Sequence, residues 1–387
     1  MTGEQVVKAK GKREERASAE RVDESSVLRL HESGTIPIAR MRASNGPLPA
    51  QPRLLVVGIV PTLTWSVARS LVLAGHKPMV LGAHRTSPMQ LFPGMQYVAW
   101  QNVRWFDDDL DPLLVDQIED ICLEHNVDCV LPADYPTTML LSDYGYGVRS
   151  ARVAAVPHSG LIRRLHNKWE FSKILRRLGL PQPHTELAPD ASALASTALE
   201  FPVVTKPVDR QGGQGFQIHR SREQLEQRIV EAGLTAQYPM ILQEHIPGQD
   251  VGFAFLARHG QLVAHAAFEQ PVRGSRRYFD APRLRQYVAT LVRETGYHGV
   301  GEIDTRYDPT SDDYRLLEVN PRFWDSILFA AHAGMNFPDL LLHLDGLPAS
   351  VGFNAQIEPV RLSMFESAAS RSVLMAEELH NSMRPAR

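Results

Sequence analysis

Acidic and amide side chains alternate along two late segments of the sequence that have the composition of strands. Side chains two residues apart lie on the same face of a strand. Glu302 and Asp304 therefore share one face of the first segment, and Glu318 and Asn320 share one face of the second. If the two strands form a hairpin that aligns these faces, the carboxylates and the amide converge, and Arg322 follows just beyond them.

Such a group of carboxylates needs a positive partner. Like charges about 4 Å apart in a partly buried site repel by several kcal/mol. Oxygen ligands of this kind suit Mg²⁺ or Mn²⁺, with phosphate oxygens and water completing the coordination. The alternative is a solvated face of an edge hairpin. Leu317 and Val319 favour the metal site, because we expect them to point the opposite way, into a core, without requiring acids opposite.

A cluster of glycines lies between two further segments with strand character. Residues 211–215, Gln-Gly-Gly-Gln-Gly, can bring backbone N–H groups close to phosphate oxygens. A strand rather than a helix follows, and no Gly-Lys-Ser/Thr is present, so this is neither a Walker loop nor a dinucleotide fingerprint. A plain flexible hairpin is an alternative. Lys206, at the end of the preceding strand, favours a phosphate site, and Lys168 is a second candidate cation or an ordinary solvated lysine.

The segment Gln243-Glu244-His245-Ile246 ends an apolar strand with polar residues, and Asp250 follows shortly after. The backbone edge of such a strand can bind a purine base, and an acid beyond it can bind ribose hydroxyls. An ordinary strand exit into a Pro-Gly turn is the alternative.

The elements that must position these residues begin near residue 51. Short apolar runs rich in branched residues alternate with helical spacing over 51–157, which predicts a parallel α/β sheet. In this part we expect strands in LLVVGIV, PMVLGA and DCVLPAD, and helices over 66–74 and 111–125.

Helices and strands also alternate over the rest of the chain. We expect helices over 167–178, 221–232, 284–295 and SILFAAHAG. The expected strands are FPVVTKPV, GFQIH, MILQEHI, VGFAFLA, QLVAHAAFE, GVGEIDTRY and YRLLEVN. Arg258-His259-Gly260 has the composition of a hairpin turn. The residues from about 365 form either an added helix or a tail.

Composition excludes several classes of protein. The formal charge of −3 on 387 residues offers no basic excess for nucleic acid or for an acidic membrane surface. No apolar run is long enough to span a membrane, and the N-terminus lacks the apolar stretch of a secretory signal. Cys122 and Cys129 are expected to be buried small apolar residues in a reducing compartment. We therefore expect a cytoplasmic protein that binds neither nucleic acid nor membrane.

In order and spacing, these pieces resemble the ATP-grasp superfamily, and in particular its carbamoyl-phosphate-synthetase-like carboxylate–amine ligases. The resemblance covers about 164–347. The stretches that carry it are NKWEFSKILRRLGLPQP, FPVVTKPVDRQGGQGF, ILQEHIPGQDVGFAF and GEIDTRYDPTSDDYRLLEVNPRFWDS.

The resemblance implies an N-terminal parallel α/β (pre-ATP-grasp) domain followed by a two-lobed ATP-grasp fold, of mixed α/β and α+β class. The implied domains are a disordered lead at 1–50, the α/β domain at 51–157, the ATP-grasp domain at 158–350 and a C-terminal extension at 351–387. Within the ATP-grasp domain, the nucleotide lobe spans about 200–250, and the metal and acceptor lobe spans about 250–350.

The resemblance also implies roles for individual residues. ATP phosphates would be bound by Lys168, by Lys206 (which would also lie near the adenine) and by the flap glycines Gly212, Gly213 and Gly215. Adenine would be bound by Glu244 and the backbone of Ile246, ribose by Asp250, and metal ions by Asp304, Glu318 and Asn320, with Glu302 as a less certain ligand. Arg322 would stabilise the transferring phosphoryl group, and Arg273, Arg276 and Arg277 would bind the acceptor carboxylate.

The implied activity is ATP-dependent ligation of a carboxylate to an amine through an acyl-phosphate, with ATP and Mg²⁺ (or Mn²⁺) as cofactors, small-molecule substrates and a homodimer as one assembly. A bicarbonate-using enzyme and a nucleotide-binding regulator without turnover are the alternatives. Two positions depart from the family pattern. Asp250 is displaced by one position from the ribose acid of some relatives, and Asp325 stands where relatives often carry glycine or another small residue.

Overall fold

The computed structural model of the protein describes residues 47–83, 87–100, 103, 110–210, 212–232, 238–351 and 358–382. Of the expected disordered lead, residues 1–46 lie outside the described residues, as does Gln211 of the glycine cluster. Within the described part of the chain, no helix is both long and apolar enough to cross a membrane.

The first described part of the chain folds around a parallel sheet, as the alternating pattern predicts. The strand order is β3-β2-β1-β4-β5, and all neighbouring pairs are parallel. The strands are β1 (Leu54–Gly58), β2 (Met79–Gly82), β3 (Gln96–Ala99), β4 (Cys129–Pro132) and β5 (Arg152–Val153). The helices are α2 (Pro61–Leu73), α3 (Leu114–His125) and α4 (Tyr135–Tyr144), with 3₁₀ turns η2 (Pro88–Leu91) and η3 (Gly145–Gly147).

Both cysteines belong to this domain and are buried without a disulfide, as the composition predicts. Cys122 lies on α3 and Cys129 on β4. Burial raises the pKa of each thiol to about 12, so both remain protonated at neutral pH.

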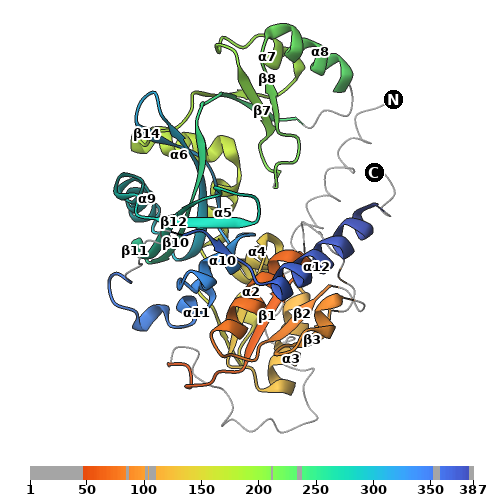
Figure 1. Ribbon diagram of the computed structural model, residues 1–387. Coiled ribbons are helices and arrows are strands. Elements are labelled where there is room, and N and C mark those ends of the chain that lie inside the picture. The colour runs from red at the N-terminus through yellow and green to blue at the C-terminus, as the bar shows by residue number, and fades with distance from the viewer. Residues whose placement is uncertain are drawn as a thin grey trace, which may run out of the picture. The chain divides into compact units, whose positions relative to one another are not determined.

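A smaller, antiparallel sheet follows helices α5 (Ser159–His166) and α6 (Lys168–Leu178). Its order is β6-β9-β7-β8, and it lies at the top of Figure 1 with two helices. Its elements are β6 (Thr185–Ala188), α7 (Ala191–Ala195), β7 (Val203–Pro207), β8 (Gln217–His219), α8 (Arg222–Ala232) and β9 (Met240–Glu244). The pattern of the sequence did not predict β6 or α7.

The largest sheet is six-stranded, with the order β14-β13-β10-β11-β12-β15. Its strands are β10 (Gln249–Arg258), β11 (Gln261–Glu269), β12 (Ser275–Phe279), β13 (Gly299–Asp308), β14 (Asp313–Asn320) and β15 (Val360–Arg361), and α9 (Pro282–Thr295) packs against it. His259 and Gly260 both have positive φ, as the predicted tight turn between β10 and β11 requires.

A β-bulge near the end of the β13–β14 hairpin corrects one expectation. The register pairs Glu302 with Asn320 and Asp304 with Glu318, so the polar faces align as predicted. After Asp304 the register shifts, and Thr305 pairs with Leu316. Leu316 is therefore buried in the core, whereas Leu317, which was expected to point there, lines a pocket together with Glu318. Val319 is buried as expected.

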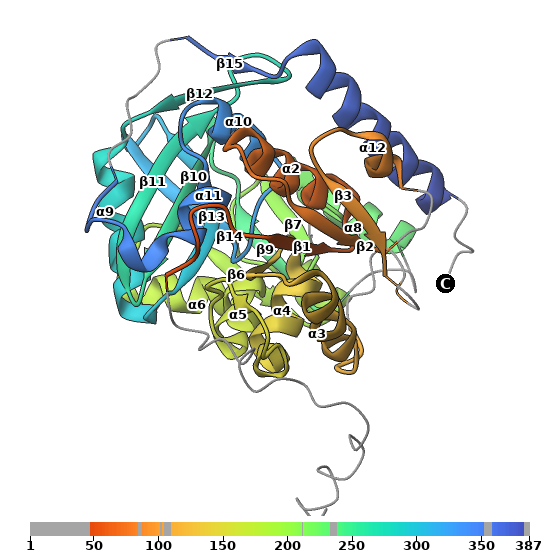
Figure 2. The ribbon, with the colours of Figure 1, turned by 90° about the horizontal axis from the view of Figure 1, so that it is seen from below.

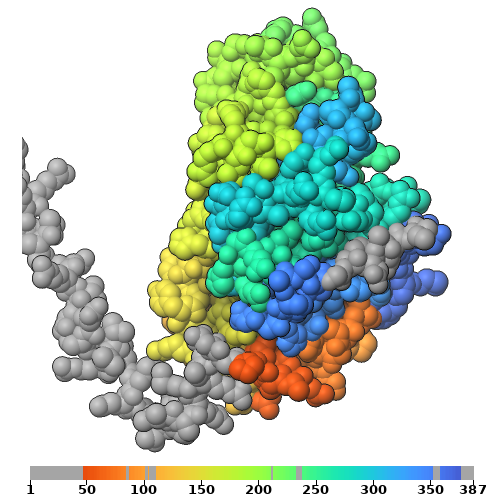
Figure 3. All heavy atoms as spheres, turned by 90° about the vertical axis from the view of Figure 1, so that its left-hand side faces the viewer, coloured from red at the N-terminus to blue at the C-terminus, as the bar shows by residue number. Residues whose placement is uncertain are grey.

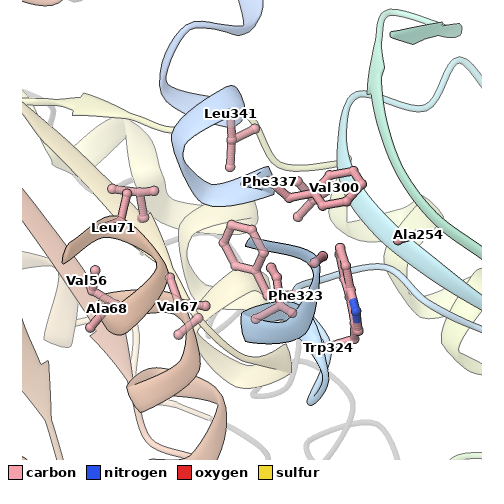
Figure 4. Packing of buried hydrophobic residues seen from close by; sticks show 14 of the residues in the cluster. Val56, Val67, Ala68, Leu71, Ala254, Val300, Phe323, Trp324, Phe337 and Leu341 are labelled. Atoms are coloured by element: carbon pink, nitrogen blue, oxygen red, sulfur yellow. The ribbon is translucent and has the colours of Figure 1, made fainter. Parts of the chain in front are cut away.

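The parallel domain and the large sheet share one hydrophobic core. Helices α10 (Ile327–His332) and α11 (Phe337–Leu342) lie between them, and the 3₁₀ turn η5 (Leu344–Gly346) follows. Figure 4 shows Val67 and Leu71 of α2 on one side of Phe337, and Val300 of β13 on the other. Arg258 donates hydrogen bonds to the carbonyls of residues 344, 345 and 347. These bonds fix the segment 344–347, drawn in blue in Figure 3, beside the large sheet.

The last described helix, α12 (Met364–Ser382), returns to the first domain and packs along α2 (Figure 2). The indole Nε1 of Trp65 donates to Ser370 Oγ over 3.1 Å. Arg69 pairs with the buried carboxylate of Glu366 at 3.1 Å, and His332 contacts the same carboxylate at 2.8 Å. Of the two possibilities for the residues from about 365, the helix is therefore the one that the structure shows.

Candidate active site

The carboxylate of Glu318 joins three parts of the fold. It extends from β14, and its Oε2 lies 3.3 Å from Nζ of Lys206 on β7 and 3.6 Å from Nζ of Lys168 at the start of α6. Both lysines are buried, at 6–7% exposure. The backbone N–H of Lys168 donates to Val208 O over 2.8 Å, and its Nζ donates to Arg210 O over 2.5 Å. The two lysines and the glutamate therefore form one fixed cluster.

The charges of this cluster stabilise one another. Burial alone would raise the pKa of Glu318, but Lys206 and Lys168 outweigh it and lower the pKa. Burial lowers the pKa of Lys168, and the charge of Glu318 partly opposes that shift. The result is an ionised Glu318 between two cations that face the same pocket.

The neighbouring carboxylates are less well compensated. Asn320 Nδ2 donates to Glu302 Oε2 over 2.8 Å. Burial raises the pKa of Asp304 well above its ordinary value, and the charges of Glu302 and Glu318 add to the shift. Burial also raises the pKa of Glu302. A divalent cation among these oxygens would favour the ionised acids, and carboxylate and amide oxygens are ligands that Mg²⁺ accepts. Among the described residues, however, no three acidic, histidine or cysteine side chains are arranged as a metal-binding group.

Arg322 is buried between this hairpin and the parallel domain. Its Nη2 donates to Asn320 Oδ1 over 3.0 Å, and its Nη1 donates to Phe323 O over 2.6 Å. It also interacts electrostatically with Glu302 and with Asp134, which follows β4. The large sheet and the carboxyl edge of the parallel sheet thus meet at this arginine.

Asp134 was not among the residues selected from the sequence. It is fully buried, and its side chain accepts hydrogen bonds from the backbone N–H groups of Ile59, Val60 and Thr137. Its position at the end of an apolar strand, followed by Tyr135-Pro136-Thr137, is a helix-capping signal that could have identified its structural role. Its closeness to Arg322 depends on tertiary packing and has no local signal.

The glycine cluster forms the connection between β7 and β8. Gly212, Gly213 and Gly215 all have left-handed backbone conformations, with φ of 62°, 72° and 73°. A pocket of about 200 Å³ is lined by Lys168, Lys206, Arg210, Gly213, Gln214, Phe216, Asp250, Asp304, Thr305, Leu317 and Glu318. The structure therefore brings the glycine loop, the two lysines and the acids of the hairpin to one cavity.

Of the residues selected for base and ribose binding, the structure places Asp250 at this pocket. Asp250 lines it and pairs with Arg306 across the β10–β13 ladder at 2.8 Å. The carboxylate of Glu244, at the end of β9, accepts from the backbone N–H of His184 over 3.1 Å. Ile246 is buried. Among the described residues, neither Glu244 nor Ile246 belongs to the lining of the pocket.

The structure separates the arginines selected for acceptor binding. Arg276 and Arg277 are adjacent on β12 and therefore point to opposite faces. Arg277 pairs with Glu269 on β11, whereas Arg276 interacts electrostatically with Glu302 of the site. Arg273 is exposed in the preceding turn. Of the three arginines, Arg276 is the one whose charge interacts with a carboxylate of the site.

Comparisons with known proteins find similarity to ATP-grasp proteins and to ligases. A family described as "ATP-grasp in the biosynthetic pathway with Ter operon" matches residues 236–365, which include β10, β13 and β14. The chain is 27% identical over 206 residues to a D-aspartate ligase from Enterococcus faecium, over 46% of this chain and 48% of the ligase. It is 24% identical over 245 residues to the large chain of carbamoyl phosphate synthase from Pyrococcus furiosus, over 57% of this chain and 23% of that one.

The chain thus spans about half or less of the length of these curated relatives. Among solved structures, the chain is similar to N5-carboxyaminoimidazole synthetase from Staphylococcus aureus complexed with ADP. The TM-score is 0.62 at 13% identity, over 82% of this chain and 83% of that one. This likeness concerns the fold, which extends through the parallel domain as well as the two antiparallel sheets.

Proposed function

We propose that this chain, which has an ATP-grasp fold, is an ATP-dependent ligase that activates a carboxylate as an acyl-phosphate and joins it to an amine. The observation that carries the proposal is the convergence of Lys168, Lys206 and Glu318 with the acids of the β13–β14 hairpin beneath a glycine loop. The similarity to a D-aspartate ligase supports carbon–nitrogen bond formation.

In this proposal, the pocket holds the triphosphate of ATP. Lys168 and Lys206 neutralise phosphate oxygens, and the N–H groups of the glycine loop cover them. Lys206 also lies near the adenine, which rests against Glu244 and the backbone of Ile246, while Asp250 binds ribose. The left-handed conformations of Gly212, Gly213 and Gly215 support the loop's role, because they allow backbone amides to approach an anion closely.

Asp304, Glu318 and Asn320 are the proposed ligands of Mg²⁺, for which Mn²⁺ could substitute, and Glu302 is a candidate fourth ligand. When bound, the metal supplies positive charge to the phosphates. Because Nδ2 of Asn320 donates a hydrogen bond to Glu302, Oδ1 is the amide atom that would coordinate the metal. Nη2 of Arg322 donates a hydrogen bond to this oxygen and so orients it. Arg322 thus acts on both the metal ligands and the phosphoryl group.

The reaction proceeds in two steps. A carboxylate oxygen of the acid attacks the γ-phosphorus of ATP, forming an acyl-phosphate as the bond to ADP breaks. The neutral amine then attacks the acyl carbon, loses a proton, and expels inorganic phosphate. Such chemistry depends mainly on positioning and charge neutralisation, which Arg322 and the lysines supply. The glycine loop limits access of water to the acyl-phosphate. Arg276 binds the carboxylate of the acid.

The test is a screen for ADP and phosphate release with amino acids and small carboxylates, supplied singly and in pairs with amines. The proposal predicts ADP formation that requires an acid, and a ligated product that also requires an amine. ATP binding without ADP formation across the whole panel would overturn it in favour of a nucleotide-binding regulator. Light scattering on the same preparation tests the expected homodimer.

A second candidate is an enzyme that phosphorylates bicarbonate, favoured by the similarity to carbamoyl phosphate synthase. The same screen distinguishes the two functions. ADP release that depends on bicarbonate and needs no organic acid would replace the ligase proposal.

A further inference from the structure

We infer that the acid substrate is an α-amino acid, and that Asp325 recognises its ammonium group while Arg276 binds its carboxylate. This inference rests on the proposed ligase function and goes further, because it names the substrate class and a residue that determines specificity. It starts from the position at which the chain carries an acid in place of the small residue expected from the family pattern.

Asp325 is an exposed acid on a turn whose other residues are buried. Phe323, Trp324 and Ser326, which surround it in the sequence, are 1%, 3% and 7% exposed, whereas Asp325 is exposed. The aromatic residues pack into the core shared by the two domains, and Trp324 contacts Phe337 at 5.0 Å between ring centroids. The turn is therefore firmly anchored. In the part of the chain that the structure describes, Asp325 forms no ion pair.

Arg276 provides the complementary charge. Its guanidinium lies 5.3 Å from the ring centroid of Phe329 on α10, the helix that begins just after Asp325. Its Nη1 donates to Ser275 O over 2.9 Å. Considering only the described residues, no carboxylate lies within ion-pair distance of Arg276. Phe329 thus holds a guanidinium in place with donors available for a substrate carboxylate.

The two groups act on the same region. Asp325 precedes Phe329, over whose ring the Arg276 guanidinium lies, by four residues. It follows Arg322, which donates to Asn320 Oδ1 of the site, by three residues. Asp325 therefore stands on the anchored turn between these two arginines, and its electrostatic interaction with both agrees with that position. A ligand carrying only a carboxylate would meet an unpaired like charge at Asp325. A zwitterion offers an anion to Arg276 and a cation to Asp325, which complements both charges.

Recognition of the ammonium also assigns the roles of the two substrates. An ammonium bound to a carboxylate is held in its protonated form and has no lone pair with which to attack. The amino acid bound at Asp325 is therefore the one whose carboxylate is phosphorylated. The attacking nitrogen belongs to the second substrate, so the product retains the free amino group of the first.

The experiment compares α-amino acids with their desamino analogues, such as alanine with propionate, by ATP-dependent ADP release from the full chain. The variants are Asp325→Asn, Asp325→Glu and the control Asp116→Asn, which changes an exposed aspartate on α3. ATP affinity is measured separately by calorimetry. We expect Asp325→Asn to raise KM for amino acids by more than tenfold, with little change for desamino acids and for ATP. Asp325→Glu should recover part of the loss, and Asp116→Asn should match the wild type.

Two results would overturn the inference while leaving the ligase intact. One is equal use of amino and desamino acids by the wild type. The other is an equal effect of Asp325→Asn on both classes, which would show that Asp325 only moderates the charge of the arginines. Failure of the proposed function itself is distinct, because then no organic acid stimulates ADP release in any variant.

Discussion

At the scale of single residues, the site depends on Glu318, which contacts both lysines and lies opposite Asp304 in the hairpin. We expect Glu318→Ala to lower turnover by about 10²-fold or more, because it removes a preorganised charged group and a proposed metal ligand. Steady-state ADP release measures the effect, with circular dichroism to verify the fold. Unchanged turnover in the folded variant would contradict the assignment of the site.

A buried lysine and an exposed lysine allow a matched comparison. Lys206 is buried at the pocket, whereas Lys173 on α6 is 47% exposed and pairs with Glu170. Lys206→Ala should reduce kcat/KM for ATP by about 10²-fold or more, since a buried cation beside the phosphates is lost. Lys173→Ala should change it by less than about twofold, because exposed ion pairs contribute little. Similar effects for the two variants would argue against a phosphate-binding role for Lys206.

The residues that converge at the hairpin could be selected from the sequence because strand alternation is a local property. Alternation alone places Glu302 with Asp304 and Glu318 with Asn320, and the register then aligns them. Leu317 was misplaced because the bulge arises from how two strands pair, and neither strand encodes it alone. The closeness of Asp134 to Arg322 could not be predicted from the sequence for a similar reason, since it depends on domain packing.

At the scale of elements, dependence on strand pairing also explains why the sequence did not predict which of the selected arginines faces the site. The stretch that contains Arg276 and Arg277 has too few apolar residues to be recognised as a strand. It becomes β12 because β11 and β15 pair with it. Once it is a strand, alternation sends Arg276 toward the site and Arg277 toward Glu269. By contrast, the apolar strands β1, β10 and β11 were predictable from composition.

The glycine loop provides a prediction that separates backbone conformation from packing. Gly213 and Gly215 both have positive φ, so an alanine at either costs about 1 kcal/mol. At Gly213 an added Cβ meets nothing within 4 Å, whereas at Gly215 it would lie 2.8 Å from the ring of Pro207 on β7. We expect Gly215→Ala to raise KM for ATP more than Gly213→Ala, because the shift of Pro207 also displaces the neighbouring Lys206.

ATP-dependent ADP release gives the KM for each variant, and thermal unfolding reports the loss of stability. Gly75→Ala serves as a control, since Gly75 also has positive φ and open space around it but lies after α2, in the parallel domain. An equal rise in KM for Gly213→Ala and Gly215→Ala would show that the contact with Pro207 has no consequence for the site.

At the scale of the whole molecule, α12 connects the late part of the chain to the first domain through Glu366. Burial raises the pKa of this carboxyl, but hydrogen bonds from Ser363 and the charge of His332 outweigh it and lower the pKa. A pKa lower in the folded state means that Glu366 contributes stability above the ordinary glutamate value of about 4.3. That contribution is lost as the pH falls through the lower, folded-state value.

Glu366→Gln should therefore reduce the free energy of unfolding by about 1.5–3 kcal/mol at neutral pH, the typical contribution of a hydrogen bond to a charged group. The difference from the wild type should shrink as the pH falls from about 4.3, where the unfolded chain takes up the proton, through the lower folded-state pKa of Glu366. Melting temperatures of both proteins across the pH range test this. A difference that is the same at pH 3 and pH 7 would show that the charge of Glu366 does not stabilise the docking of α12.

The packing of α12 on α2 also has a consequence for biosynthesis. Helix α2 is among the first described elements to emerge from the ribosome, and α12 is the last. The contacts of Trp65 and Arg69 of α2 with Ser370 and Glu366 of α12 thus form only after the intervening part of the chain has been translated. The N-terminal domain can therefore reach its final form only after α12 has been synthesised, even though its sheet is made early.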